Sequence, residues 1–272
     1  MTSHDVVARA RRASGVKKIG HAGTLDPLAT GVLVLCVGAA TRLSEYVMHT
    51  TKGYRARVRL GTTTETYDAE GEIVRTRDAT HVTRDAVEHA LGQFTGKIEQ
   101  IPPMYSAIKQ GGRKLYDLAR AGETVERAPR PVQIFSLTLI DWAAPEFTLD
   151  VTCSAGTYIR SLAYDIGEVL GVGAHLAGLT RTASGVFTLE NAVPLDTLLN
   201  DPADYLIPPS EALHQYPALV LDAAAEDDVK HGRAISGDLA DGIVAMAYDA
   251  GDRLIAVLEA EDGRLKPQKV FI

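Results

Sequence analysis

Residues 53–61 alternate between apolar and basic side chains, and this alternation constrains the fold more strongly than any other feature of the chain. The alternating set consists of Tyr54, Ala56, Val58 and Leu60 on one side and Arg55, Arg57 and Arg59 on the other. A period of two is typical of a β-strand with one face in the core and one face outside it. The chain is therefore expected to build a sheet, with Tyr54 on the inward face of this strand.

Helical and strand-like patterns follow one another along the rest of the chain. Helices are expected at 3–14, with Ser3 as the cap, at 83–94, and from the turn at 155–157 to about residue 170. Strands are expected at 131–141 and 146–153, with a strand pair around 65–75, and the apolar run 31–38 fits a buried strand or a buried helix. These patterns predict an α+β fold with a mixed, largely antiparallel central sheet flanked by helices.

Changes in composition divide the chain into regions. Residues 97–130 combine paired prolines, paired glycines and seven Lys/Arg against four acidic residues, which is typical of a basic excursion from a core. Prolines between 202 and 217 indicate a linker, and 218–272 contains short apolar runs separated by Asp/Gly turns. We therefore expect a main domain at 1–210, with an insertion at 97–130, and a small β-rich domain at 215–272.

The overall composition is that of a globular protein. Of the 272 residues, 46% are hydrophobic and 23% are charged. The two cysteines, Cys36 and Cys153, form no C-x-x-C pair, so neither a disulfide framework nor a cysteine zinc site is expected. No apolar run approaches the roughly 18 residues that a membrane-spanning helix needs. These features predict a soluble, cytoplasmic protein without a membrane segment.

Charge is distributed unevenly along the chain. The net charge is −7, whereas residues 1–60 hold ten Lys/Arg and only three acidic residues. A basic end on an acidic chain indicates a phosphate-binding surface in one interpretation and a solvated charged face in the other. The sequence leaves both interpretations open.

Two segments hold residues that could carry chemistry. The loop 20–31 contains three glycines together with His21, Asp26 and Pro27, but Asp-Pro alone is also a common helix start, in which Asp is the cap. At 153–162, Arg160 lies among apolar neighbours and needs a carboxylate partner. Asp150 and Asp165 are the local candidates and Asp26 is the distant one. A pair with Arg160 would keep Asp26 ionised, as a nucleophile requires.

At this point the chain resembles a known family. The run G-H-A-G-T-L-D-P-L-A-T-G-V-L at 20–33 is similar to the signature loop of the TruB-type tRNA pseudouridine synthases. Four further motifs of that family follow in the expected order, namely K-x-Y at 52–54, I-P-P-M-Y-S-A-I-K at 101–109, G-T-Y-I-R at 156–160 and L-T-R-T at 179–182. Together the motifs run through most of residues 2–190.

The resemblance implies roles for individual residues. Asp26 would be the nucleophile, attacking the target uridine at C6 of the base or at C1′ of the sugar, and Arg160 would be its ion-pair partner. Tyr54 would stack on the flipped uracil, although from its strand position alone it could equally be core. The other substrate-binding residues would be His21, in the space that the base leaves, and Tyr158 and Leu179, lining the uracil pocket.

The same resemblance implies the partners of the chain. The substrate would be the T-arm of tRNA, and the family uses no metal and no organic cofactor. From its charge, we expect the 97–130 insertion to clamp the RNA through Lys109, Arg113 and Lys114. No membrane contact and no obligate protein partner are expected, and the chain is expected to be a monomer. The last domain resembles a PUA-like RNA-binding module. Family members usually carry a strand and a K-P-x-G segment before the T-S-H-D-V-V motif, which starts here at Thr2, so an N-terminal strand is expected to be missing.

Three other functions remain open. An RNA-guided synthase of the box H/ACA type has the same catalytic core, although the compact C-terminus and the insertion favour a stand-alone tRNA enzyme. A non-catalytic RNA-binding or tRNA-folding protein would have no need of both Asp26 and Arg160. A glycosidase would need a second acidic side chain in the cleft beside Asp26, and no motif supplies one.

Overall fold

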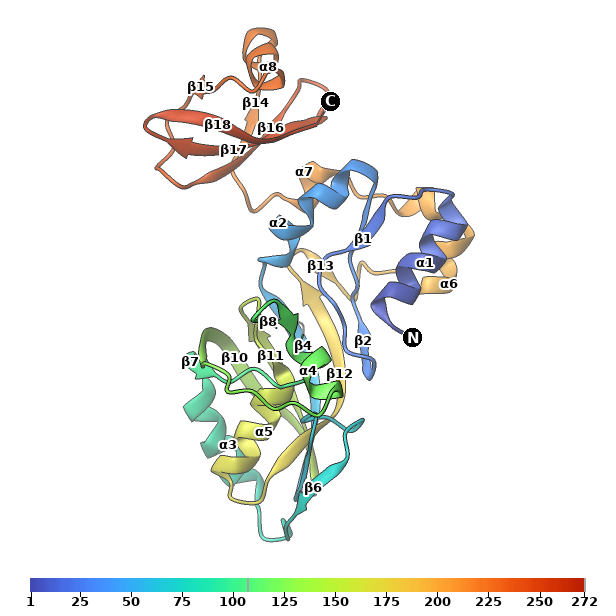
Figure 1. Cartoon of the computed structure of the whole chain (residues 1–272), viewed down its shortest axis with the longest axis vertical. Helices are drawn as coiled ribbons and strands as arrows, with labels where there is room; N and C mark the ends of the chain where they lie inside the picture. Colours follow the sequence, from blue (N-terminus) through green and yellow to red (C-terminus); the bar gives the residue numbers. More distant parts are fainter. Residues whose placement is uncertain (107, 272) are drawn as a thin grey trace. The chain divides into compact units, whose positions relative to one another are not determined.

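The computed structural model describes residues 1–106 and 108–271 (Figure 1). Ala107, in the expected motif at 101–109, and Ile272, in the last apolar run, lie outside the described residues. The chain forms two compact units. The first consists of Met1–Ser3, Gly23–Val34 and Met48–Val193, and the second consists of His4–Ala22, Leu35–Val47 and Pro194–Ile272.

The first unit is built on a central sheet with the strand order β13-β12-β4-β11-β10-β7, to which β2 is added beside β12. The strands are β2 (Ala29–Gly31), β4 (Lys52–Leu60), β7 (Gly96–Gln100), β10 (Arg130–Ala143), β11 (Glu146–Cys153), β12 (Ala174–Ser184) and β13 (Phe187–Thr188). All neighbouring strands are antiparallel except β2 and β12, which are parallel. The predicted α+β fold with a mixed, largely antiparallel sheet is confirmed.

The expected period of two in β4 determines which face of the sheet is covered. Ala56, Val58 and Leu60 are almost fully buried in the main hydrophobic core. The helices α3 (Arg84–Leu91), which continues into the 3-10 turn η2 (Gly92–Phe94), and α5 (Ile159–Val169) supply the other side of this core (Figure 1). The arginines on the opposite face of β4 pair with acidic residues of β11: Arg55 with Asp150, and Arg57 and Arg59 with Glu146.

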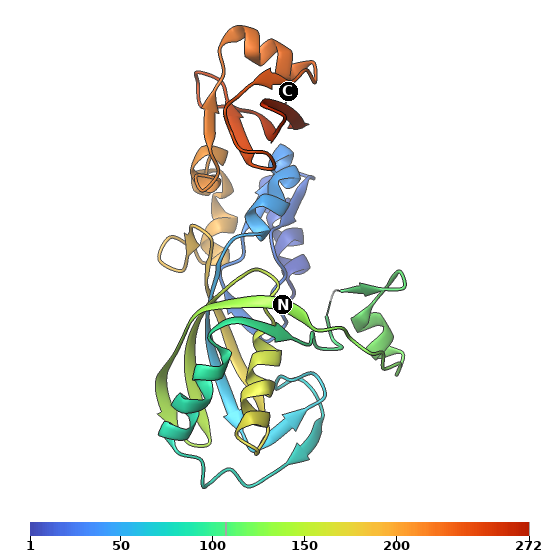
Figure 2. The same cartoon turned by 90° about the vertical axis from the view of Figure 1, so that its left-hand side faces the viewer.

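Two hairpins lie outside the main sheet of the first unit. One consists of β5 (Thr62–Thr64) and β6 (Ile73–Thr76), which confirms the strand pair expected around 65–75. The other consists of β8 (Lys109–Gln110) and β9 (Arg113–Lys114), followed by α4 (Leu115–Arg120), and it projects away from the sheet (green in Figure 2). Because 96–100 form β7 of the sheet, the excursion expected from residue 97 leaves the sheet only after Gln100.

The second unit contains a five-stranded sheet of order β14-β16-β17-β18-β15. Its strands are β14 (Ala218–Val220), β15 (Ile235–Ser236), β16 (Val244–Tyr248), β17 (Leu254–Glu261) and β18 (Arg264–Val270), and α8 (Ala223–Lys230) packs on them. The predicted β-rich C-terminal module is confirmed, whereas α8 was not expected. The unit also contains most of α1 (Ser3–Ser14), β1 (Ile19–His21), β3 (Leu35–Val37), η1 (Gly38–Leu43), α2 (Ser44–Met48), α6 (Leu195–Asn200), η3 (Pro202–Tyr205) and α7 (Pro209–Ala212).

Two local predictions are wrong. The apolar run 31–38 forms neither one strand nor one helix, because the backbone turns at Gly31, whose φ is +97°, and only Leu35–Val37 continue as β3. Ser3 does not cap its own helix, since its hydroxyl accepts a hydrogen bond from the Leu25 N–H at 2.9 Å and so contacts the residue before Asp26. Within the described ranges, no helix is long and apolar enough to cross a membrane.

Candidate active site around Asp26

Asp26 lies in a turn that leads directly into the central sheet. Its carbonyl accepts a hydrogen bond from the Ala29 N–H at 2.9 Å, and β2 then pairs with β12 in the register Ala29↔Leu179 and Gly31↔Arg181. No helix starts at Pro27, so the interpretation of Asp26 as a helix cap is wrong. The carboxylate is therefore carried on a short loop that is fixed to a rigid sheet.

The side chain of Arg181 is hydrogen-bonded to the main chain of this loop. Its side chain is buried, and Nε donates to the Val32 carbonyl at 2.7 Å, while Nη2 donates to the Gly23 carbonyl at 3.1 Å. At Gly31, a Cβ would lie 2.2 Å from the Arg181 carbonyl oxygen, so only glycine allows the loop to approach the strand this closely. Arg181 belongs to the L-T-R-T motif, but its role could not be predicted, because its acceptors are main-chain carbonyls that the sequence does not reveal.

Arg160 pairs with Asp26 through two nitrogens. The residue lies in the first turn of α5, and its Nε is 2.9 Å from Oδ2 of Asp26 while Nη2 donates to Oδ1 at 3.0 Å. The Arg160 side chain is only 6% exposed, and that of Asp26 is 34% exposed. Asp150, one of the two local candidates, pairs with Arg55 instead. The geometry leaves the carboxylate open on one side while its orientation is fixed on the other.

Nε of Arg160 is close to Asp26 without a well-aligned hydrogen bond, and the two terminal nitrogens make further contacts. Nη2 donates to the Tyr105 carbonyl at 2.9 Å and Nη1 to the Thr66 carbonyl at 3.3 Å. Nη1 also lies 3.5 Å from Oδ2 of Asp68, whose side chain is 4% exposed. A second acidic side chain therefore lies near the Asp26–Arg160 pair, although no sequence motif supplies it. Asp68 belongs to the hairpin turn at 65–72, far from the loop motif in sequence.

The ionisation of Asp26 reflects competing influences. Burial raises the pKa of Asp26 most, the Arg160 guanidinium opposes this rise, and the nearby Asp68 carboxylate adds to it. The net effect is a pKa above the ordinary aspartate range. The expected stabilisation of the ionised form by Arg160 is thus present but smaller than the effect of burial.

Three further predicted site residues lie around this pair. Tyr54 and Arg181 are cross-strand partners on β4 and β12, and the nearby Arg181 guanidinium opposes the rise that burial gives to the pKa of Tyr54. Leu179 is buried on β12 beside Ala29 of the loop. The main chain of Tyr158, at the start of α5, is held by the Gln100 side chain at 2.7 and 3.0 Å. Burial raises the pKa of both tyrosines, and the Asp26 charge adds to the rise in each case.

The other predicted residues belong to other elements of the chain. His21 is in the second unit, on β1, where it pairs with Leu35 and meets His4 edge to face at 5.3 Å between ring centroids. Lys109, Arg113 and Lys114 lie on the projecting β8–β9 hairpin. Arg113 Nη1 is bonded to Glu123 at 2.9 Å, and Lys114 Nζ donates to the Tyr116 hydroxyl at 2.9 Å. In the described part of the chain, no group of His, Cys, Asp and Glu side chains could hold a metal ion.

The chain matches known family models along most of its length. Residues 11–159 match the N-terminal domain of the TruB family pseudouridylate synthases. The chain belongs to this family. It is therefore a pseudouridine synthase, an isomerase. Residues 160–213 match the tRNA pseudouridylate synthase B C-terminal domain, and 216–272 match the C-terminal domain of tRNA pseudouridine synthase II.

Relatives of this TruB-family chain match it along most of its length. The tRNA pseudouridine synthase B of Burkholderia pseudomallei (strain 668) is 47% identical over 283 residues, covering 100% of this chain and 93% of the relative. That of Symbiobacterium thermophilum is 52% identical over 237 residues, covering 86% and 79%. Among solved structures, the crystal structure of a Cbf5–Nop10–Gar1 complex matches with a TM-score of 0.78 at 27% identity, covering 100% of this chain and 82% of the other. The archaeal box H/ACA sRNP Nop10–Cbf5 complex matches with a TM-score of 0.75 at 26% identity, covering 100% and 83%.

Proposed function

We propose that this TruB-family chain converts the uridine at position 55, in the T-loop of tRNA, to pseudouridine in the cytoplasm, with Asp26 as the nucleophile. The observation that carries this proposal is the two-nitrogen ion pair between Arg160 and Asp26 on a loop fixed to the sheet. The relatives named tRNA pseudouridine synthase B support tRNA as the substrate.

Asp26 supplies covalent catalysis in this proposal. The reaction breaks the C1′–N1 bond of the uridine, rotates the released uracil and forms a C1′–C5 bond, after which C5 loses its proton and N1 gains one. A carboxylate that forms a covalent intermediate divides this change into easier steps. Arg160 orients the carboxylate and favours its ionised form, because its planar fork matches the two oxygens.

The residues around the ion pair bind the flipped base. Removing the uridine from its stack costs a few kcal/mol, and stacking on an aromatic side chain offsets that cost. Tyr54 provides the ring, which is half-buried beside its cross-strand partner Arg181. Tyr158 and Leu179 form the walls of the uracil site, and His21 fills the position that the base vacates.

RNA binding involves the rest of the main domain. We assign catalysis to 1–210, a clamping role to the 97–130 insertion and an accessory RNA-binding role to 215–272. Of the three basic residues proposed to bind phosphate, Arg113 is neutralised by Glu123, so Lys109 and Lys114 supply most of the net charge of the hairpin. The chain acts as a monomer and without an obligate protein partner in this proposal.

Two alternatives receive less support. The structures of the RNA-guided box H/ACA type share the fold at 26–27% identity, whereas the relatives named as tRNA enzymes reach 47–52%. Asp68 gives the site a second carboxylate, as a glycosidase would need, but its partner is Arg160 and the family is one of isomerases. We therefore assign Asp68 to the support of Arg160.

The test is incubation of the purified chain with an unmodified tRNA transcript, followed by nucleoside analysis. The proposal predicts one pseudouridine per transcript, which disappears when uridine 55 is replaced by cytidine. A transcript with cytidine at another T-loop position is the matched control and keeps its pseudouridine. Product at a different uridine would refute the position, and product only with an added guide RNA would favour the box H/ACA type.

A further inference from the structure

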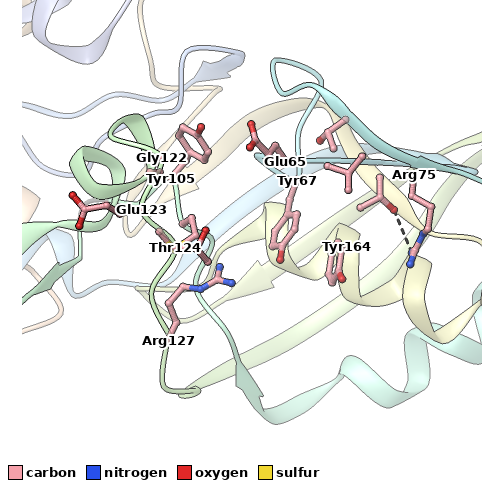
Figure 3. Close-up of a pocket in the computed structure, with 14 residues that line it drawn as sticks. Glu65, Tyr67, Arg75, Tyr105, Gly122, Glu123, Thr124, Arg127 and Tyr164 are labelled. Atoms are coloured by element: carbon pink, nitrogen blue, oxygen red, sulfur yellow. Dashed lines mark hydrogen bonds between the residues drawn. The ribbon is translucent and has the colours of Figure 1, made fainter.

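Arg160 and Tyr164 contact the same short turn from one face of α5. Residues four apart on a helix lie next to each other on its surface. Arg160 bonds the Thr66 carbonyl and lies beside the Asp68 carboxylate. The Tyr164 ring stacks on the ring of Tyr67, with 4.1 Å between centroids and 22° between planes (Figure 3). The helix therefore holds three consecutive residues of the turn, 66–68, through two side chains.

The turn itself is tightly fixed and its central residue is strained. Tyr67 has a φ of +64°, a conformation that costs free energy for any residue other than glycine. Its carbonyl accepts from the Leu176 N–H at 2.9 Å. On the following residue, Oδ1 of Asp68 accepts from the Thr66 hydroxyl at 2.5 Å and from the Glu70 N–H at 3.0 Å. A strained conformation persists only where surrounding contacts fix it. Here it places the Thr66 carbonyl and the Asp68 carboxylate beside Arg160.

The rings of Tyr67 and Tyr164 contribute little to the hydrophobic core. Both are half-buried, and among the described residues neither belongs to the main hydrophobic core. They line a cavity of about 490 Å³ together with Tyr105 and Arg127 (Figure 3). The main chain of Tyr105 is itself an acceptor for Arg160. The stack thus lies next to the Thr66 and Tyr105 carbonyls, which accept from Arg160, and it contributes little to the packing of the sheet.

We propose that the Tyr67–Tyr164 stack is a positioning device that holds the 66–68 turn against Arg160 and thereby fixes the orientation of Asp26. Both tyrosines are positioning residues, since they act through Arg160. The inference rests on the proposed catalytic role of the Asp26–Arg160 pair. Tyr164 is connected to Arg160 by one helical turn, and Tyr67 is connected to it by the peptide groups of its two neighbours. Movement of either ring therefore changes the contacts of the guanidinium.

The first test compares kcat and KM for Tyr164→Ala, Tyr164→Phe, Tyr67→Phe and Tyr67→Gly on the tRNA transcript. Glycine accepts the positive φ of residue 67, so Tyr67→Gly removes the ring without adding backbone strain. The two variants that lose a ring should lower kcat roughly 3- to 10-fold, the factor that one aromatic pair is worth, with KM unchanged. Both Phe variants keep the stack and should keep wild-type kcat. A loss of kcat in the Phe variants, or a change in KM alone, overturns the inference.

The second test does not depend on turnover and so separates this inference from the proposed function. The carboxyl carbon of Asp26 is titrated by NMR in the wild type, Tyr164→Ala and Tyr164→Phe. Among the groups near Asp26, Arg160 lowers its pKa and Asp68 raises it, and the titratable groups of Glu70, Tyr54 and Tyr158 also interact with its charge. A loosened Arg160 should therefore move the Asp26 titration to higher pH in Tyr164→Ala but not in Tyr164→Phe. An unchanged titration in Tyr164→Ala overturns the inference whether or not the wild type modifies tRNA.

Discussion

Asp68 lies 3.5 Å from Nη1 of Arg160, while Nε and Nη2 of the same guanidinium hold Asp26. One arginine thus joins two carboxylates, of which one is almost fully buried and the other is partly open. A guanidinium that is held at two edges cannot rotate away from Asp26 without losing its contact with Asp68. Replacing Asp68 and replacing Arg160 should therefore shift the pKa of Asp26 in opposite directions.

Replacing Asp68 should separate orientation from charge. Asp68→Asn keeps an oxygen for the Thr66 hydroxyl and the Glu70 N–H but removes the negative charge. We expect kcat to fall by at most roughly tenfold, because Arg160 loses one contact but keeps those with Asp26 and with the Thr66 and Tyr105 carbonyls. The acid limb of the pH–rate profile should move to lower pH, since the Asp68 charge raises the pKa of Asp26. A profile that moves to higher pH would contradict this assignment.

Replacing Arg160 should move the same limb the other way. Arg160→Met removes the charge that opposes the effect of burial, so the pKa of Asp26 rises further. A larger fraction of the Asp26 carboxylate is then protonated at a given pH. Arg160→Lys keeps a charge but lacks the planar fork and should still lose roughly 100-fold in kcat. The pH–rate profiles of both variants are the measurement. Equal activity of Arg160→Lys and the wild type would show that the fork is not needed.

Tyr54 distinguishes stacking from packing. Tyr54→Phe keeps the ring and should preserve RNA affinity, whereas Tyr54→Ala should lose about 1–3 kcal/mol of base stacking. Because Tyr54 also packs against the main hydrophobic core, Tyr54→Ala should melt at a lower temperature, whereas Tyr54→Phe should not. RNA affinity and a melting curve are measured side by side. If Tyr54→Ala unfolds at working temperature, the residue is core rather than platform.

The basic hairpin should dominate the salt dependence of RNA binding. Neutralising Lys109, Arg113 and Lys114 together should flatten the slope of log affinity against log salt by about two units. The expected change is two units rather than three because Arg113 is already paired with Glu123. The matched control neutralises Arg253, Arg264 and Lys266, on the small module. The slopes of both triple variants decide the matter. A larger loss in the control set would place the main RNA contact on the C-terminal module.

Strand periodicity could be predicted from sequence because it depends on neighbours in the chain. The alternation at 53–61 predicts β4 and its buried face, and similar patterns predict β10 and β11. The run 31–38 misled because continuous apolar character does not reveal the turn that Gly31 makes against β12. Helix α8 was missed for a related reason, since its small residues 223–225 give little apolar periodicity.

The site was predictable only as far as its motifs extend. The loop motif and the G-T-Y-I-R motif identified Asp26 and Arg160, which the structure brings together. The roles of Asp68, Arg181 and Tyr164 depend on tertiary contacts between β5–β6, β12 and α5, and no spacing in the sequence encodes those contacts. The basic residues Arg55, Arg57 and Arg59 of β4 could not be assigned to phosphate or to solvent from the sequence. In the structure, each of these three arginines pairs with an acidic residue of β11.

The most direct test of the account is Asp26→Asn, measured by single-turnover pseudouridine formation and by equilibrium RNA binding on the same transcript. The change preserves size and one oxygen that can accept from Nη2 of Arg160, but it replaces the other oxygen with an NH2 group that cannot accept from Arg160, and it removes the nucleophilic charge. The account predicts that no pseudouridine forms while the dissociation constant for RNA stays within about twofold of the wild type, because phosphate contacts elsewhere supply the affinity. Product formation at a rate near that of the wild type would remove Asp26 from the role of nucleophile and contradict the account.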